Sequence, residues 1–171
     1  MHWIFAYGSN MHLPDLRRWL HADGSAEAVP SRVVAARIEG YELAWNYRSV
    51  ARAGGAANAM PCAGGELRGL ALWGTDALLA ALDRKEGHPG RYDRGVEPVR
   101  AIALDDRQSL SAWLYRVAPS HQRDTAIPPR GAYLALLIEA AEEHALGADY
   151  VARLRDIPTL DGPGDGRDPV P

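Results

Sequence analysis

The chain has 171 residues, of which 47% are hydrophobic, and a formal net charge of -3 at pH 7. This length and this apolar content fit one domain with a single hydrophobic core. Basic residues are scattered rather than gathered into a stripe, which excludes the usual signature of a nucleic-acid-binding protein and favours a small molecule as the partner. A lone cysteine excludes an internal disulfide, and no apolar segment is long enough to span a membrane. We expect a cytoplasmic protein.

The chain begins with an apolar run that ends abruptly. Residues 2–6 are typical of a short buried strand, and Gly8, Ser9 and Asn10 of the turn that leaves it. Apolar residues then recur at helical spacing over residues 13–20, for which Asn10 is the expected N-cap. The opening is therefore predicted to be a strand, a tight loop and a short helix.

The next part of the chain is rich in β-branched and aromatic residues. Residues 31–47 predict two strands, or one strongly bent strand, with a break at Gly40. The Gly, Ala and Pro content of residues 51–65 predicts a flexible loop, after which residues 66–73 resume a strand.

Leucines at helical spacing predict a helix that starts at Thr75 or Asp76 and stops at Gly87. On this helix, Asp83 is expected to be a surface charge. Residues 91–104 and 109–117 then resemble the two arms of a hairpin.

The C-terminal part contains two further predicted helices, over residues 131–144 and 149–155. Residues 159–171 are too rich in Gly, Pro and Asp to pack, so we expect one domain over residues 1–158 and a disordered tail after it. Strands mixed with helices, without regular alternation, indicate an α+β fold, and the glycine breaks suit a bent, partly closed sheet.

The loop Tyr7-Gly8-Ser9-Asn10 has the form of an anion-binding nest. A loop between a strand and a helix presents several backbone N–H groups in one direction, where they could hold a carboxylate or a developing oxyanion. Gly8 would let a ligand approach the backbone, and Ser9 and Asn10 could add side-chain donors. By chemistry alone, a plain turn with a helix cap is the simpler interpretation. Ser9 lacks the setting of an attacking serine.

Glu86 occupies the last position of its predicted helix. There the negative end of the helix dipole disfavours a carboxylate and makes it a better base. For an arbitrary helix, however, a solvated glutamate is the commoner finding. The histidines and Cys62 show no metal-ligand spacing, so we predict no metal. No nucleotide-binding motif is present either.

Four segments in this order resemble the γ-glutamylcyclotransferases and their AIG2-like relatives. These segments are FAYGSNM, GGAANAMPCAGGELRGLALW, LDRKEGHPGRYD and GAYLALLIEAAEEHALGADYVARL. The resemblance covers roughly residues 4–157. It implies a small mixed β-barrel flanked by helices, and an enzyme that converts a γ-glutamyl amide to 5-oxoproline without a cofactor.

The resemblance also implies roles for particular residues. Glu86 would be the acid and base, and Tyr7, Gly8, Ser9 and Asn10 would form the substrate-binding loop. Tyr133 would approach the same cavity from a late helix, and Gly54 and Gly55 would lie in a strand near it. His88-Pro89 departs from the family pattern after Glu-Gly and is expected at the cavity rim, while Arg68 stands where relatives often have an apolar residue.

Two alternatives stay open at the level of sequence. The same fold could bind a small γ-glutamyl ligand without turning it over, or it could act on γ-glutamylamines or on a γ-glutamyl biosynthetic intermediate. Asn10 makes glutathione a less expected substrate, because relatives specialised for it generally carry another residue after Tyr-Gly-Ser. The leaving amine would contact residues 48–62 and 118–130. The sequence sets neither its identity nor the oligomeric state.

Overall fold

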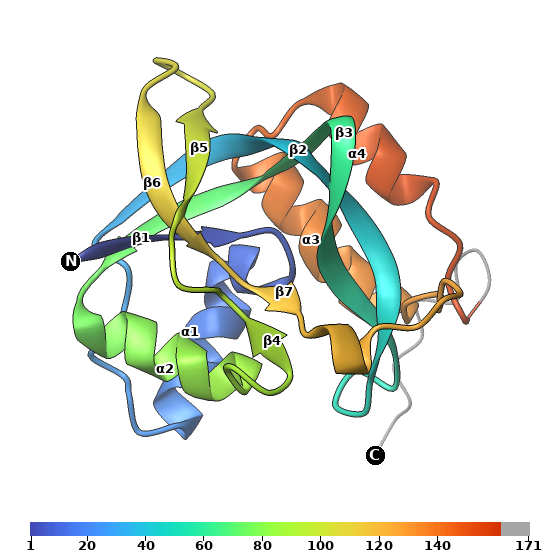
Figure 1. The fold of residues 1–171 in the computed structure, drawn as a ribbon, viewed down its shortest axis with the longest axis horizontal. Coiled ribbons are helices and arrows are strands. Elements are labelled where there is room, and N and C mark those ends of the chain that lie inside the picture. The colour runs from blue at the N-terminus through green and yellow to red at the C-terminus, as the bar shows by residue number, and fades with distance from the viewer. Residues whose placement is uncertain (162–171) are drawn as a thin grey trace.

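The computed structural model describes residues 1–161, which form a β-barrel flanked by helices (Figure 1). The strands are β1 (His2–Ala6), β2 (Arg32–Ser49), β3 (Gly54–Gly74), β4 (Tyr92–Asp93), β5 (Val99–Ala103), β6 (Ser109–Leu114) and β7 (Arg116–Val117). The helices are α1 (Leu13–Ala22), α2 (Asp76–Glu86), α3 (Gly131–Glu143) and α4 (Ala148–Arg155), with 3-10 turns η1 (Ser9–Met11) and η2 (Pro119–His121). The predicted α+β class with a mixed barrel is confirmed.

The barrel closes through its first strand. Its strand order is β1-β3-β2-β5-β6, and the parallel pairing of β1 with β6, which sets Phe5 opposite Leu114, joins the two ends. The other pairs are antiparallel. Ile4 and Phe5 are almost completely buried because β1 is covered by neighbours on both of its faces.

β2 and β3 form one long hairpin that bends across the molecule (Figure 1). The bend lies at the irregularity between Glu39 and Tyr41, where Gly40 has a φ of +80°. A positive φ is reached readily only by glycine, so the predicted break at Gly40 is a bend within one continuous strand.

The prediction of a flexible loop over residues 51–65 is wrong for most of its length, since β3 starts at Gly54. Ala56, Ala57 and Ala59 are buried there, and Ala56 and Ala59 pair with β2. Small residues have a low strand propensity, but here they let neighbouring segments approach the backbone closely, so tertiary packing overrides the local preference.

The two predicted arms, residues 91–104 and 109–117, pair with each other, so the predicted hairpin is confirmed. β5 and β6 pair as expected across the turn, with Val99 opposite Ala112. Farther from the turn, β4 pairs with β7, so the same two arms also form a separate two-stranded sheet.

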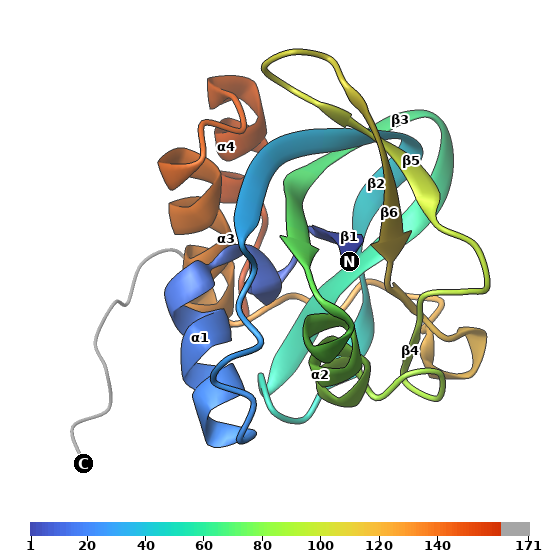
Figure 2. The ribbon, with the colours of Figure 1, turned by 90° about the vertical axis from the view of Figure 1, so that its left-hand side faces the viewer.

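The helices cover the barrel from two directions. α1, α3 and α4 lie along one side, and α2 lies at one end of the barrel beneath β1 and β3 (Figure 2). α2 runs from the N-cap Thr75 to the C-cap Gly87, whose φ is +67°, as the sequence predicts. None of the helices within residues 1–161 is long and apolar enough to cross a membrane.

The N-cap of α1 is His12, and the prediction that Asn10 has this role is wrong. The Nδ1 atom of His12 accepts a hydrogen bond of 3.2 Å from the backbone amide of Asp15. Residues 9–11 form the separate turn η1, which delays the start of α1 and frees the Asn10 side chain for another contact.

The predicted disordered tail lies mostly outside the described residues. Residues 159–161 are described, and two of them contact the segment before α3. The Leu160 amide donates to the Pro129 carbonyl at 2.9 Å, and the Asp161 carboxylate pairs with Arg130. The domain boundary at residue 158 stays a prediction.

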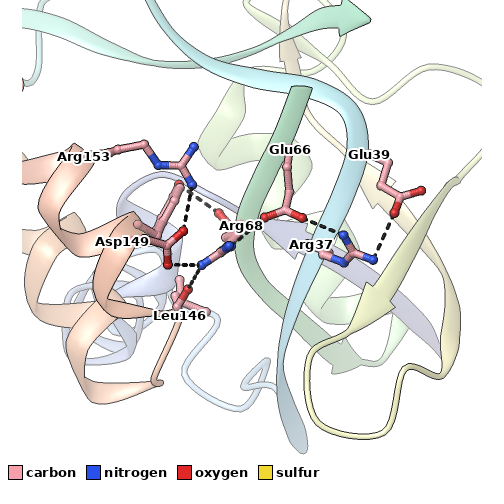
Figure 3. A network of polar contacts seen from close by, with 8 residues as sticks. Arg37, Glu39, Glu66, Arg68, Leu146, Asp149 and Arg153 are labelled. Carbon is pink, nitrogen blue, oxygen red and sulfur yellow. Dashed lines mark hydrogen bonds and ion pairs between the residues drawn. The ribbon is translucent and has the colours of Figure 1, made fainter. Parts of the chain in front are cut away.

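Arg68 joins β3 to α4 through a charged network (Figure 3). Its guanidinium donates to the Glu66 carboxylate at 2.7 Å, to Asp149 at 2.7 Å and to the Leu146 carbonyl at 2.9 Å. Arg37 reaches the other oxygen of Glu66 at 2.6 Å, and this hydrogen bond is the main reason that the pKa of Glu66 is lowered. A charged residue is therefore accommodated at a position where an apolar one was expected, because every polar group around it finds a partner.

We predict that Arg68→Met lowers the free energy of unfolding by about 1 to 3 kcal/mol, because the buried Leu146 carbonyl and Glu66 each lose a charged donor. Urea denaturation followed by circular dichroism measures the change. Arg153→Met is the matched control, since Arg153 is exposed and contacts the same Asp149 only at 3.6 Å. Equal stability of wild type and Arg68→Met would contradict the assigned role of the network.

Candidate active site

Two adjoining cavities lie at the end of the barrel that α2 covers. An outer cleft of about 620 Å³ extends toward α1, and a deeper cavity of about 50 Å³ is lined by the loop that follows β1. The residues that line both are Ser9, Glu86, Tyr92 and Tyr133. The two cavities are therefore parts of one site.

The loop of residues 7–10 forms one wall of the deep cavity. Tyr7 is 5% exposed and donates its hydroxyl hydrogen to the Tyr115 carbonyl at 2.6 Å. A Cβ atom added at Gly8 would lie 3.2 Å from the Tyr133 hydroxyl oxygen. Any larger residue at this position would press on the Tyr133 hydroxyl, so glycine favours the close packing of the loop against Tyr133.

Glu86 enters the site from the opposite wall, at the last position of α2. The buried leucines Leu78 and Leu82 fix the helix against the barrel. Arg91 then donates to the Glu86 carbonyl at 3.1 Å and to the Lys85 carbonyl at 2.6 Å, which satisfies two of the free carbonyls at the helix end. The position of the Glu86 side chain is therefore set by the packing of a whole helix.

Asn10 connects the two walls. Its Nδ2 atom donates to the Glu86 carboxylate (Oε1) at 2.8 Å. Its Oδ1 atom is buried and accepts no hydrogen bond from the described residues. An unpartnered acceptor at the wall of a cavity can accept a hydrogen bond from a ligand, for example from an ammonium group.

Three buried tyrosines surround the carboxylate, and their hydroxyl groups stay protonated. Burial raises the pKa of Tyr133 to about 12. Burial, and then the negative charge of Glu86, also hold the pKa of Tyr7 well above its usual value, and burial does the same for Tyr92. Ala57 fixes two of the rings, because its carbonyl accepts from Tyr92 at 2.8 Å and its amide donates to Tyr133 at 3.4 Å. The site thus combines one carboxylate with neutral hydroxyl groups.

Gly54 and Gly55 lie outside the lining of both cavities. The Gly55 amide donates to the Pro128 carbonyl at 3.0 Å, and a Cβ atom at Gly55 would lie 1.8 Å from the Ile127 carbonyl oxygen. This glycine is needed so that the segment before α3 can pack against β3. Gly54 and Gly55 therefore pack against the segment that leads into α3, and their predicted role in substrate binding stays a prediction.

His88 and Pro89, which are joined by a cis peptide bond, also lie outside both linings and not at the expected rim. Within residues 1–161, no group of three or more His, Cys, Asp or Glu side chains is arranged to hold a metal ion.

Sequence reasoning missed several lining residues. Tyr92 lies six positions after Glu86 in the quoted segment LDRKEGHPGRYD, so its place in that motif was an available signal. Arg52 lies in the segment predicted as a loop, where no geometry could be inferred, and its guanidinium stacks 5.2 Å from the centre of the Tyr133 ring. Asp15 and Trp19 come from α1, whose contribution to the site no motif indicated.

Asp83 is half-buried, and the prediction that it is a surface charge is wrong. It accepts a hydrogen bond of 2.6 Å from the Tyr115 hydroxyl and pairs with Arg94 at 2.9 Å. Burial opposes its ionisation, but the bonds from Arg94 and Tyr115 outweigh this effect and hold the pKa of Asp83 below its usual value. This carboxylate ties α2 to the segment after β6 and so supports the position of Glu86.

The closed barrel with its flanking helices is a fold that is known from solved structures. A structure described as a gamma-glutamyl cyclotransferase has a TM-score of 0.74 and 21% identity, and the match covers 95% of this chain and 91% of that one. An uncharacterized protein from Homo sapiens gives 0.77 and 23%, with the same coverage. A yeast cyclotransferase specific to glutathione gives 0.56 and 12%, over 90% of this chain and 93% of that one. These likenesses show the fold.

The family follows from the sequence comparison. A family model described as Gamma-glutamyl cyclotransferase, AIG2-like, matches residues 4–135, so the chain belongs to this family. No curated protein matches the chain.

We predict that Asp83→Asn lowers the free energy of unfolding by about 1 kcal/mol near neutral pH, because Arg94 loses its charged partner. A lowered pKa in the folded state means that the stabilisation is complete above about pH 4, the usual range of an unfolded aspartate, and is lost as the pH falls through the folded value. The difference between wild type and variant should therefore shrink on acidification below about pH 4, which urea titrations at several pH values measure. A difference independent of pH would contradict the role of the charge.

Proposed function

We propose that this protein is a γ-glutamylcyclotransferase that converts a γ-glutamyl amide to 5-oxoproline and releases a free amine. The observation that carries the proposal is the contact between Glu86 and Asn10, 2.8 Å long, which brings a carboxylate to a small cavity beside the loop of residues 7–10. Membership of the family supports this reaction.

The substrate supplies its own nucleophile. Its α-amine can reach the γ-carbonyl carbon by closing a five-membered ring, and a site that holds the chain in this folded form contributes about 7 kcal/mol or more through proximity. The protein therefore has to bind, orient and exchange protons, and the proposal requires no cofactor.

Glu86 is proposed to carry the proton. The α-ammonium group of the substrate gives one proton to the carboxylate, and the resulting amine attacks the γ-carbonyl carbon to form the ring C–N bond. When the original amide C–N bond breaks, the same proton passes from Glu86 to the departing nitrogen. The ring nitrogen still carries one extra proton after the attack, and Glu86 moves this second proton to the released amine, which leaves as an ammonium group while the carboxylate is regenerated. The buried Oδ1 atom of Asn10 provides an acceptor that could orient the ammonium group beside Glu86.

The loop of residues 7–10 is proposed to stabilise the oxyanion and hold the glutamyl group. Its backbone N–H groups are the candidate donors, and one well-placed donor contributes on the order of 3 kcal/mol. The protonated hydroxyl of Tyr133 lies against Gly8 and could act as a further donor. The surrounding apolar wall strengthens these interactions by excluding water.

A second candidate is a binding protein that holds a γ-glutamyl compound in the same cavities without converting it. The contact of Glu86 with Asn10 would then only fix the loop. Cyclotransferases acting on γ-glutamylamines or on a γ-glutamyl biosynthetic intermediate are alternatives within the same chemistry.

We predict that Glu86→Gln lowers kcat by about 100-fold to 10,000-fold, because glutamine can still accept from Asn10 but cannot move a proton. The assay incubates purified protein with γ-glutamyl amino acids, γ-glutamylamines and glutathione, and it measures 5-oxoproline. Glu97→Gln is the matched control, since this glutamate is exposed and lies outside both cavities.

Undiminished turnover by Glu86→Gln would remove this residue from the proposed role. If the wild type formed no product from any compound but bound one of them in calorimetry, the binding protein would be the correct interpretation.

A further inference from the structure

The outer cleft is strongly basic. Its lining includes two carboxylates, Asp15 and Glu86, and a larger set of basic side chains, namely Arg18, Arg52, Arg84, Lys85 and Arg91. This excess contrasts with the whole chain, whose net charge is -3. A concave surface with one sign of charge concentrates ligands of the opposite sign.

Three of these basic groups already have carboxylate partners. Arg18 and Arg52 share Asp15, at 3.1 Å and 2.9 Å. Burial opposes ionisation of Asp15, but the hydrogen bond and charge of Arg52 hold its pKa below its usual value. Arg84 pairs with Asp23 at 2.6 Å.

Lys85 and Arg91 differ, because neither has a carboxylate within 4.0 Å among residues 1–161. The Arg91 guanidinium donates to two carbonyls at the end of α2, which use two of its five N–H donors and supply no carboxylate partner. The Lys85 ammonium lies 5.5 Å from the centre of the Trp19 ring and is partly buried. This burial lowers the pKa of Lys85, so a bound anion would restore the interactions that the ammonium loses on leaving water.

Lys85 also lies at the junction of the two cavities. It directly precedes Glu86, which lines both of them, while Lys85 lines only the outer cleft. If the glutamyl group occupies the deep cavity and Glu86 gives a proton to the amide nitrogen, the leaving amine lies in the outer cleft.

We propose that the outer cleft recognises a negatively charged group on the leaving amine, and that Lys85 is the specificity-determining residue for it. This inference rests on the proposed function and names its substrate class: γ-glutamyl compounds whose released amine carries a carboxylate or a phosphate. Amines that are neutral or positively charged, which include the γ-glutamylamines, gain no such partner, and the cationic ones are repelled. Trp19 and Tyr47 in the same lining provide flat apolar surface for the carbon skeleton of the leaving group.

The test holds the glutamyl group constant and varies the leaving amine. The series comprises γ-glutamyl conjugates of glutamate, alanine, phosphoethanolamine, butylamine and a diamine. Binding to Glu86→Gln protein is measured by calorimetry, which does not depend on turnover, and kcat and KM are measured with the wild-type residue at position 86.

Lys85→Met keeps an apolar stem of similar length but removes the charge. We expect about tenfold weaker binding of the glutamate, alanine and phosphoethanolamine conjugates, whose leaving amines carry an anionic group, little change for the butylamine conjugate, and rescue by Lys85→Arg. Raised salt should weaken the anionic conjugates selectively. Arg17→Met is the matched control, since Arg17 is an exposed residue of α1 outside the lining.

Equal affinity of the Glu86→Gln protein for the negatively charged and neutral conjugates would overturn the proposal. A uniform loss for every conjugate in Lys85→Met would also overturn it, because the lysine would then bind the shared glutamyl carboxylate. Selective binding without any 5-oxoproline from wild type would contradict the proposed reaction and still support the anion site. The relative affinities of the glutamate and phosphoethanolamine conjugates identify which anion fits.

Discussion

The hydrogen bond between Asn10 and Glu86 depends on nearly every other part of the fold. It joins a loop after the first strand to the end of α2, 76 residues later in the chain. β1 must close the barrel against β6 so that its loop points toward α2, and the leucines of α2 must pack so that Glu86 turns inward. The hydrogen bond is short because two well-packed elements determine both of its ends.

Hydrogen bonds and an ion pair also fix the residues around Glu86. Asp83, one turn before Glu86, is held by Tyr115 and Arg94, while Arg91 occupies the carbonyls at the end of the same helix. Tyr7 and Tyr92 bond to backbone carbonyls and so present fixed rings to the cavity. Among the residues that line the deep cavity, Asn10 has a buried acceptor, Oδ1, without a hydrogen-bond partner within residues 1–161, and a ligand donor could bind there.

The two proposals place the glutamyl group of the substrate in the deep cavity and its leaving amine in the outer cleft. The deep one is small, lined by tyrosines and the loop of residues 7–10, and suits one compact group. The outer one is larger and basic, and it receives residues from α1 and from the start of β3. The expected contact of the leaving amine with residues 118–130 has no counterpart in its lining, whereas Ser49, Ala51 and Arg52 come from the other expected segment.

The sequence by itself determined the elements that hydrophobic periodicity and capping residues indicate. These are β1, α2 with Thr75 and Gly87 as its caps, α3 and α4. It also determined the family, because ordered motifs survive where overall identity is low. Tertiary structure alone decided that residues 54–65 form a strand, that Asp83 is half-buried, and that α1 and Lys85 line the cleft. The physical reason is that small residues and charges gain their roles from distant partners, such as Ile127 above Gly55 or Arg94 beside Asp83, and no local pattern records those contacts.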